Sequence, residues 1–349
     1  MIRQEPMERK RSAGTMTGMR RAVFATALMV AALAAPPPVD AGRGYHYTVA
    51  GNPADVTTTV APGLALMGGG TDVDDAFRWL IAKSGGGDFV VIRARGSDDY
   101  NAYVHGLGGA DSVETLVIQS RRAAADPFVI ERIRNAEALF IAGGDQWNYV
   151  RLWKGTPVED AIHAVVAKGA PVGGTSAGLA ILGEFAFSAE HDTVTSIQAL
   201  GDSYHRRVTL ERDFLTLPLL ARTITDSHFV ERDRMGRSIA FLARILQDGW
   251  APEVRGIAID RETALLIEAD GSVAIRGVPN RAAYMLRASG TPEVCRPDTP
   301  LTFRGVSVYR LTGDATFDLP AWTGHGGTEY TLSAVSGSLS STQGNGSIY

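Results

Sequence analysis

Short apolar runs alternate along the chain with longer stretches in which apolar residues return every three or four positions. The runs are rich in β-branched and aliphatic residues, and two of them lead into consecutive glycines, as buried strands often do. The longer stretches have the spacing of amphipathic helices. Strands separated by helices predict βαβ crossovers, and so an α/β fold with a mostly parallel central sheet covered by helices on both faces. The predicted strands are 64–67, 88–94, 115–119 and 138–144, and helices are predicted to begin near Asp72 and Phe128.

The clearest predicted helix begins at Thr156. Threonine often caps helices, Pro157 suits the first helical position, and Glu159 completes the spacing of a capping box. Ile162 continues an apolar face, and Gly169 ends the pattern. We therefore expect the Thr156 side chain to cap this helix.

The chain changes character from about Leu301. Segments such as VSVYRL and GGTEYTLSAV combine β-branched residues with Thr, Ser and Gly, which favours short strands and turns. We therefore assign an α/β domain to residues 42–299 and a C-terminal extension to residues 300–349. The extension is predicted to be a small β-rich appendage followed by a flexible tail.

The N-terminus has the pattern of a secretory signal peptide. Arg20 and Arg21 precede an apolar run over 22–35, and small residues follow. Cleavage is expected after Ala41, with Ala35 as the alternative site, so residues 1–41 are assigned to the leader. A disordered tail is the competing interpretation. The leader predicts a secreted or periplasmic protein.

The composition argues against several classes of protein. The chain has 349 residues, 45% hydrophobic and 21% charged residues, and a net charge of -4, which is typical of an ordinary globular protein. Without a basic block there is no basis for expecting a nucleic-acid partner, and no run after the leader is long enough to predict a membrane span. Cys295 is the only cysteine, so neither an intramolecular disulfide nor a cysteine metal site can form, and no cofactor or metal is expected.

A candidate nucleophile lies at Ser176. It stands between Gly174 and Gly178 in a G-x-S-x-G pattern, after a short apolar segment and before a helical one. On such a sharp turn, a side chain two residues before or two residues after the nucleophile would collide with nearby backbone. A helix N-terminus at this point would also supply free N–H groups for a developing oxyanion.

The most suitable base is His228. It follows TITDS at the end of another predicted strand and leads into a helical pattern through Ile239 and Leu242. Parallel sheets gather their ligand sites beyond the carboxyl ends of strands, where a base for Ser176 would have to lie.

Four segments together are recognisable: ALFIAGGDQ (138–146), GGTSAG (173–178), TDSHFVERDRMGR (225–237) and RGIAIDRETALL (255–266). In order and spacing they resemble the cyanophycinase and aspartyl dipeptidase family of serine peptidases. The resemblance implies a flavodoxin-like α/β sandwich related to class I glutamine amidotransferases, and a Ser-His-Glu triad. By position it makes Ser176 the nucleophile and His228 the base. It places Gly144 and the N–H of Ala177 in the oxyanion hole, and Gln146, Asp226, Arg232, Arg234 and Arg237 in the substrate groove.

Two positions depart from the family pattern. Ser227 stands where a glutamine usually precedes the histidine, and Arg261 stands where the family has its acid. A glutamate follows one residue later, so we expect Glu262 to orient His228, with Asp260 as the second candidate. The three arginines could instead lie on a solvated helix face, paired with Glu231 and Asp233.

The sequence therefore predicts an exported serine peptidase-like amide hydrolase that acts on a peptide, with aspartyl or β-aspartyl peptides as candidate substrates. The displaced glutamate leaves open a non-catalytic peptide-binding protein. An esterase of the α/β-hydrolase type shares the G-x-S-x-G element, but its acid precedes the histidine in the chain. That alternative predicts Asp192 or Asp213 against His228.

Overall fold

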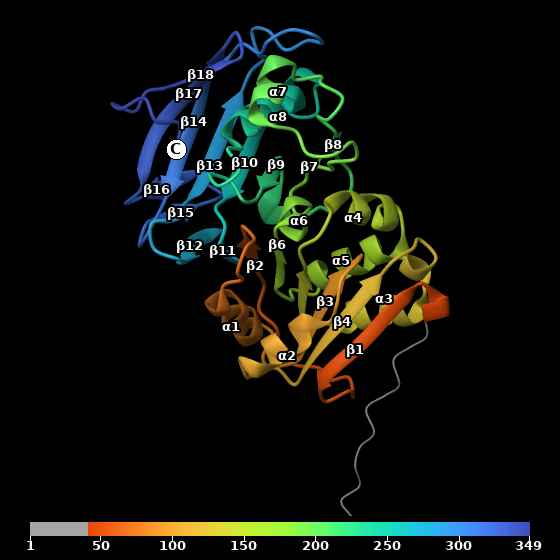
Figure 1. Cartoon of the computed structure of the whole chain (residues 1–349). Coiled ribbons are helices and arrows are strands. Elements are labelled where there is room, and N and C mark those ends of the chain that lie inside the picture. Colours follow the sequence, from red (N-terminus) through yellow and green to blue (C-terminus); the bar gives the residue numbers. More distant parts are fainter. Residues whose placement is uncertain (1–40) are drawn as a thin grey trace, which may run out of the picture. The chain divides into compact units, whose positions relative to one another are not determined.

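Five parallel strands form the middle of a ten-stranded sheet in the computed structural model (Figure 1). Antiparallel strands continue the sheet on both sides. The strand order is β1-β4-β3-β5-β6-β2-β11-β12-β15-β16. The bounds are β1 Tyr45–Gly51, β2 Gly63–Met67, β3 Asp88–Arg93, β4 Ser112–Ile118, β5 Ala138–Ile141, β6 Val172–Thr175, β11 Thr263–Glu268, β12 Ser272–Gly277, β15 Thr316–Asp318 and β16 Thr323–His325.

Helices cover both faces of this sheet because its strands are apolar on both sides. In β2, Leu64 and Leu66 enter one core cluster while Ala65 and Met67 enter another, as the two-residue period of a strand requires. This arrangement confirms the predicted α/β class and mostly parallel sheet. One face packs on α1 (Asp74–Lys83) and α2 (Asp99–Gly106), and the other on α3 (Pro127–Asn135), α4 (Gln146–Trp153) and α5 (Pro157–Ala167).

Helix α5 begins where predicted, but its cap is different. The Thr156 side chain makes no capping bond, because its hydroxyl donates to the carbonyl of Trp153 at 2.5 Å. Glu159 reaches back to the N–H of Gly155 instead of to residue 156. The prediction of a capping box at this helix was therefore wrong, because the preceding turn takes both side chains.

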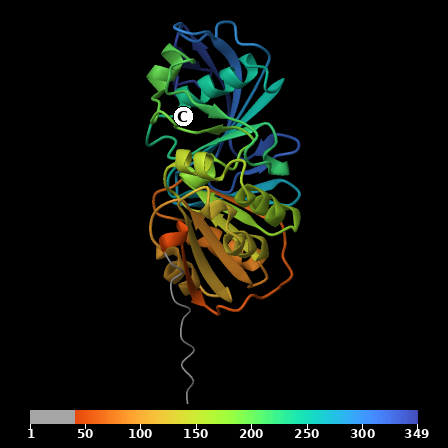
Figure 2. The same ribbon diagram turned by 90° about the vertical axis from the view of Figure 1, so that its right-hand side faces the viewer.

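A second sheet of six strands follows in the order β18-β17-β14-β13-β10-β9. Its later strands are the blue ones in the upper part of Figure 2. Its two faces also have different neighbours. Val254 and Ala258 of β10 belong to a core cluster that includes residues of helices α7 and α8. Ile257 and Ile259 belong to the core cluster that includes residues of β11. The bounds are β9 Thr223–Asp226, β10 Glu253–Ile259, β13 Ala283–Ser289, β14 Phe303–Leu311, β17 Thr328–Val335 and β18 Ser338–Ser341, with α7 at Ser196–Gly201 and α8 at Met235–Gln247.

The C-terminal region is β-rich, as predicted, and it extends both sheets. Strands β15 and β16 lengthen the first sheet, while β14, β17 and β18 lengthen the second. The residues after β18 pack back on the chain through Tyr349, which contacts the ring of Phe229. The remaining elements are β7 Ala186–Phe187, β8 Leu210–Glu211, α6 Ala177–Ala180, and three short 3-10 helices at Ala41–Arg43, Ala123–Ala125 and Pro218–Leu220.

The structure describes residues 41–349, so the predicted leader lies outside the described residues except for its last position. Within that described part, none of the helices combines the length and the apolar character needed to cross a membrane.

Candidate active site

Ser176 lies on a sharp turn between β6 and α6. Its backbone has φ 52° and ψ -112°, which a non-glycine residue adopts only under strain. Both glycines of the pattern are sterically required. A Cβ at Gly178 would lie 2.0 Å from the carbonyl oxygen of Ile141, and one at Gly174 would lie 2.8 Å from the backbone of Gly178. The sequence around Ser176 therefore folds as a nucleophile elbow.

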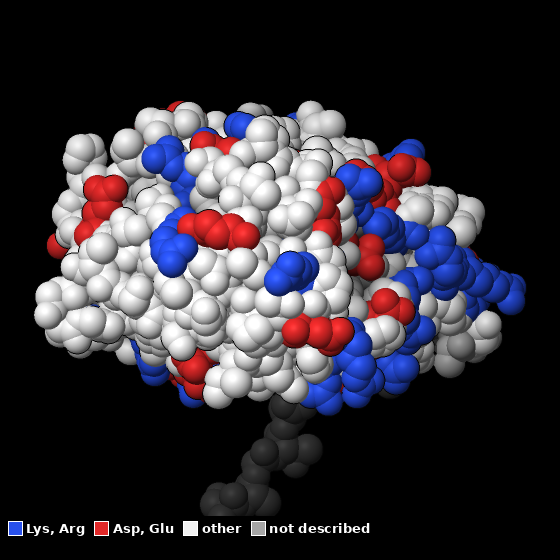
Figure 3. Space-filling model, turned by 90° about the horizontal axis from the view of Figure 1, so that it is seen from above, with Lys and Arg blue, Asp and Glu red and all other residues white. Residues whose placement is uncertain are grey.

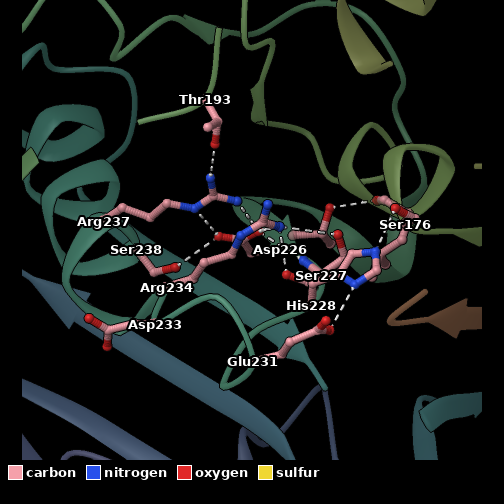
Figure 4. Close-up of polar contacts among 12 residues, drawn as sticks. Ser176, Thr193, Asp226, Ser227, His228, Glu231, Asp233, Arg234, Arg237 and Ser238 are labelled. Atoms are coloured by element: carbon pink, nitrogen blue, oxygen red, sulfur yellow. Dashed lines mark hydrogen bonds and ion pairs between the residues drawn. The ribbon is translucent and has the colours of Figure 1, made fainter. Parts of the chain in front are cut away.

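The imidazole of His228 meets the hydroxyl of Ser176. The distance from Nε2 to Oγ is 3.0 Å (Figure 4). His228 directly follows the loop after β9, with φ 44°, and its N–H donates to the carbonyl of Gly68 at 2.8 Å. Strands β6 and β9 belong to different sheets, so the predicted pair forms where the two sheets meet.

A glycine loop after β2 closes around this pair. Gly69 has φ +89°, and a Cβ there would lie 2.4 Å from Nε2 of His228 and 2.9 Å from Cβ of Ser176. The carbonyl of Gly69 accepts the N–H of Glu262 at 2.7 Å. Glycine is thus required at position 69 for two reasons, the positive φ and the close approach of the imidazole.

The carboxylate at the other imidazole nitrogen belongs to Glu231. Its Oε2 lies 3.2 Å from Nδ1 of His228. A carboxylate can only accept, so Nδ1 carries the proton and Nε2 is free to accept the proton of Ser176. This is the tautomer that a general base for the serine requires.

Glu262, the predicted orienting acid, makes other contacts. Its Oε1 accepts from the guanidinium of Arg261 at 2.8 Å, and its Oε2 lies 4.0 Å from that of Arg281. Asp260 is also engaged elsewhere, because its two oxygens accept the N–H groups of Val230 and Ala282. The backbone after Asp260 turns at Glu262, with φ 57°, and directs its carboxylate to the arginines.

Arg261 connects the two glutamates. One terminal nitrogen lies 3.5 Å from Oε1 of Glu231 and the other donates to Glu262. The guanidinium of Arg261 is therefore part of the surroundings of the carboxylate that meets His228. A local signal for Glu231 does exist in the sequence, because it follows His228 by three residues and side chains at that spacing meet on a helical turn.

The electrostatics keep His228 neutral and Glu231 ionised. Burial lowers the pKa of His228 below its usual value, Arg232 and Arg234 lower it further, and the bond to Glu231 opposes them. Slight desolvation acts to raise the pKa of Glu231, but the His228 bond and the charge of Arg261 hold it below its usual value. A neutral imidazole beside an ionised acid is ready to accept a proton.

Asp226 and Arg237 form a buried ion pair, although the sequence placed both in the substrate groove. Arg237 is 2% exposed; its Nε donates to Asp226 at 2.8 Å, and another nitrogen donates to Thr193 at 3.1 Å (Figure 4). Burial acts to raise the pKa of Asp226, but the charges of Arg237 and Arg234 hold it below its usual value. The donors of Arg237 are thus taken up by the protein.

Arg234 and Arg232 differ in their freedom. Arg234 donates to Asp226 at 3.2 Å and to the carbonyl of Ser227 at 2.7 Å, so it is partly engaged. Arg232 is exposed, and none of the ion pairs found in residues 41–349 involves its guanidinium. The arginines therefore do not pair with Glu231 and Asp233 as a solvated helix face would predict.

Two adjoining cavities open beside Ser176. Gly144, Gln146 and the three arginines line both of them, which places the predicted substrate residues next to the nucleophile. The larger cavity, of about 470 Å³, also has the acidic residues Glu190 and Asp192 in its wall. Charges of both signs also occur on the face shown in Figure 3, where basic side chains gather toward one side.

The predicted oxyanion donors lie at the smaller cavity. Gly144 and Ala177 line it together with Ser176. Ala177 is the first residue of α6, so its N–H has no partner within the helix. Within residues 41–349 the N–H of Gly144 makes no hydrogen bond either. Both donors are thus available near the serine hydroxyl.

The acids that an α/β-hydrolase esterase would use lie elsewhere. Asp192 pairs with Arg207 at 3.4 Å, and Asp213 pairs with Arg212 at 3.4 Å. The carboxylate at His228 comes after the histidine in the chain, which is the opposite order from that fold.

Comparison with known proteins identifies the family of this chain. The model of peptidase family S51 matches residues 97–274, which include Ser176, His228 and Glu231. The chain belongs to this family. Its relatives include the cyanophycinase of Trichormus variabilis, which is 31% identical over 170 residues, covering 48% of this chain and 52% of the relative. The cyanophycinase of Synechococcus elongatus is 28% identical and covers 48% of each chain. This S51 chain thus spans about half the length of the curated relatives that it matches.

Two solved structures are also similar to this S51 chain. A peptidase from an acI-B1 Actinobacterium has 17% identity and a TM-score of 0.48, covering 65% of this chain and 91% of the other. A putative peptidase E from Listeria monocytogenes has 18% identity and a TM-score of 0.38, covering 62% and 98%.

Proposed function

We propose that this protein is a serine-type amide hydrolase that forms an acyl-enzyme on Ser176. The observation that carries the proposal is the 3.0 Å contact between Oγ of Ser176 and Nε2 of His228, with both residues held at positive φ. A serine hydroxyl is a weak nucleophile without a base, and this arrangement supplies one.

In the proposed reaction, Nε2 of His228 takes the hydroxyl proton as the oxygen of Ser176 attacks the amide carbonyl. The N–H groups of Gly144 and Ala177 stabilise the oxyanion, and the positive end of α6 adds to this field. His228 then gives its proton to the leaving amine. Water, activated by the same imidazole, releases the acyl group and restores the hydroxyl.

We assign the orienting role to Glu231 rather than to Glu262. The supporting contact is the 3.2 Å separation between Nδ1 of His228 and Oε2 of Glu231. An acid in this position fixes the tautomer and stabilises the imidazolium that forms during attack. Arg261 restrains Glu231 from the other side.

The proposed substrate is a peptide with a carboxylate near the scissile amide, such as an aspartyl or β-aspartyl peptide. The exposed guanidinium of Arg232 lies in the wall of the cavity that contains Ser176, and guanidinium groups bind carboxylates well. The relatives named cyanophycinase support the same substrate class. We also propose that the leader exports the enzyme; N-terminal sequencing of the mature chain tests this point.

The test is hydrolysis of a panel of peptides: β-aspartyl-arginine, α-aspartyl dipeptides, longer aspartyl peptides, and the same peptides with asparagine at that position. We expect the wild-type protein to release amine from aspartyl members and the Ser176→Ala variant to release none. Equal release by both proteins would contradict the proposal. Cleavage of the asparagine and aspartyl peptides at the same rate would overturn the assigned substrate class while leaving the mechanism intact.

A further inference from the structure

The segment from His228 to Arg237 carries the base and the arginines, yet it lacks a local helix cap. Arg234 is the N-cap residue of α8, and its side chain makes no capping bond. The guanidinium is already used, because it donates to Asp226 and to the carbonyl of Ser227. The first N–H groups of α8 must therefore find partners elsewhere.

Those partners come from distant parts of the chain. The N–H of Met235, the first residue of α8, donates to the hydroxyl of Tyr349 at 3.1 Å. The same hydroxyl donates to Oδ1 of Asp233 at 2.8 Å. Ser196 supplies a second cap by accepting the N–H of Arg237 at 3.2 Å and donating to the carbonyl of Asp233. The hydroxyl of Tyr349 thus bonds to the residues on both sides of the N-cap, Asp233 and Met235.

The ring of Tyr349 also packs beside the base. It meets Phe229, the residue after His228, edge-on with centroids 5.9 Å apart, and it meets Tyr284 at 6.0 Å. Phe229 is completely buried, so this contact extends the core to the backbone next to the imidazole. Burial raises the pKa of Tyr349, which keeps the phenol protonated and able to donate to Asp233.

The tail that presents this ring is itself held in place. Tyr330 donates to the carbonyl of Ile348 at 3.1 Å, and the amide of Gln343 donates to the carbonyl of Ser347 at 2.8 Å. The hydroxyl of Ser347 donates to the carbonyl of Tyr349 at 2.7 Å. Tyr349 is therefore fixed from its own side as well as from the His228 side.

We propose that Tyr349 is a positioning residue for the reaction, which holds the segment carrying His228 and Glu231 through its contacts with Asp233, Met235 and Phe229. The proposal rests on the proposed function, since it concerns the reactivity of Ser176. The tail thereby contributes to the active site without touching substrate.

The experiment compares Tyr349→Phe with Tyr309→Phe. Tyr309 is a matched control, because its hydroxyl also accepts a backbone N–H, that of Gly327 at 2.6 Å, while its ring packs on Phe317 instead of Phe229. The readout is the second-order rate at which a fluorophosphonate labels Ser176 between pH 5 and 8. We expect Tyr349→Phe to lower the rate about fivefold, the usual worth of one lost hydrogen bond. Tyr309→Phe should leave the rate unchanged.

The pH profile separates positioning from a general loss of stability. The charged groups that act on His228 are Glu231, Arg232 and Arg234, and only the first raises its pKa. A loosened segment weakens that bond, so the midpoint of labelling should move to lower pH in Tyr349→Phe. An unchanged midpoint together with equal rates in both phenylalanine variants would overturn the proposal.

Asp233→Asn tests the same contact from the other side without risk to the core. Asp233 is exposed, and asparagine tolerates its φ of 48°. It should lower the labelling rate about threefold, and combining it with Tyr349→Phe should lower the rate by less than the product of the two effects. Independent effects would contradict the proposal. Absence of labelling in the wild-type protein would instead contradict the proposed function.

Discussion

Replacing Glu231 with glutamine removes the charge that faces Nδ1 of His228 and keeps the size of the side chain. Glutamine can still accept a hydrogen bond through its amide oxygen, but it cannot stabilise an imidazolium. The change therefore removes a contribution that grows as His228 takes the serine proton. Glu262→Gln is the matched control, because it makes the same substitution at the acid that the sequence favours.

The size of the effect follows from the exposure of the contact. Hydrogen bonds to charged groups contribute about 1.5–3 kcal/mol. The Glu231 side chain is 35% exposed, so solvent screening places this one at the lower end. About 1.5 kcal/mol of lost transition-state stabilisation corresponds to about a tenfold fall in kcat. A fully buried orienting acid would give a loss of about 10⁴-fold.

The assay is the pH dependence of kcat/KM for a cleaved aspartyl peptide. The folded pKa of His228 is lowered, so the neutral base and the activity should persist to a pH below the ordinary histidine value of 6.5. The bond to Glu231 raises that pKa, so Glu231→Gln should move the acid limb to still lower pH while kcat falls. A larger loss of kcat in Glu262→Gln than in Glu231→Gln would refute the assignment.

Three other predictions concern the surroundings of the site. Gly69→Ala should slow Ser176 labelling at least about a hundredfold, because its Cβ would displace the imidazole; Gly290→Ala, at φ +79° with open space around it, should not. Arg237→Met should lower the free energy of unfolding by about 3 kcal/mol in denaturant titrations, whereas Arg232→Met should change it little and instead raise KM for aspartyl peptides. Burial raises the pKa of Glu114 from 4.5 to about 7, so stability is lost as pH rises through that window. At pH 8, Glu114→Gln should therefore exceed the wild type in free energy of unfolding by about 3 kcal/mol, and should melt at a higher temperature. At pH 4.5 the two proteins should melt at nearly the same temperature. An equal difference at both pH values would contradict this prediction.

The local parts of the site could be predicted from the sequence. The G-x-S-x-G turn depends in part on neighbouring residues, because a Cβ at Gly174 would meet the backbone of Gly178. Gly178 itself is needed because of the backbone of Ile141, on the neighbouring strand β5. The two-residue alternation of β2 and the helical spacing of α1 likewise depend on local patterning, and they gave the fold class.

Long-range contacts could not be predicted in the same way. Nothing near Glu262 in the sequence indicates that its carboxylate also faces Arg281, on a later turn of the chain. The charged residues that precede Arg237 in the sequence are typical of a solvent-exposed face. Arg237 is buried because it pairs with Asp226, which lies eleven residues earlier on another element. The contact of Tyr349 with the His228 segment joins residues more than a hundred positions apart.

The most direct test of the central claim is mass spectrometry of the protein after exposure to a fluorophosphonate. We expect a single adduct, located by peptide mapping on Ser176. It should be absent in Ser176→Ala and form much more slowly in His228→Ala, because the imidazole at 3.0 Å activates the hydroxyl. A folded wild-type protein that gains no adduct, or gains it on another residue, would contradict the account.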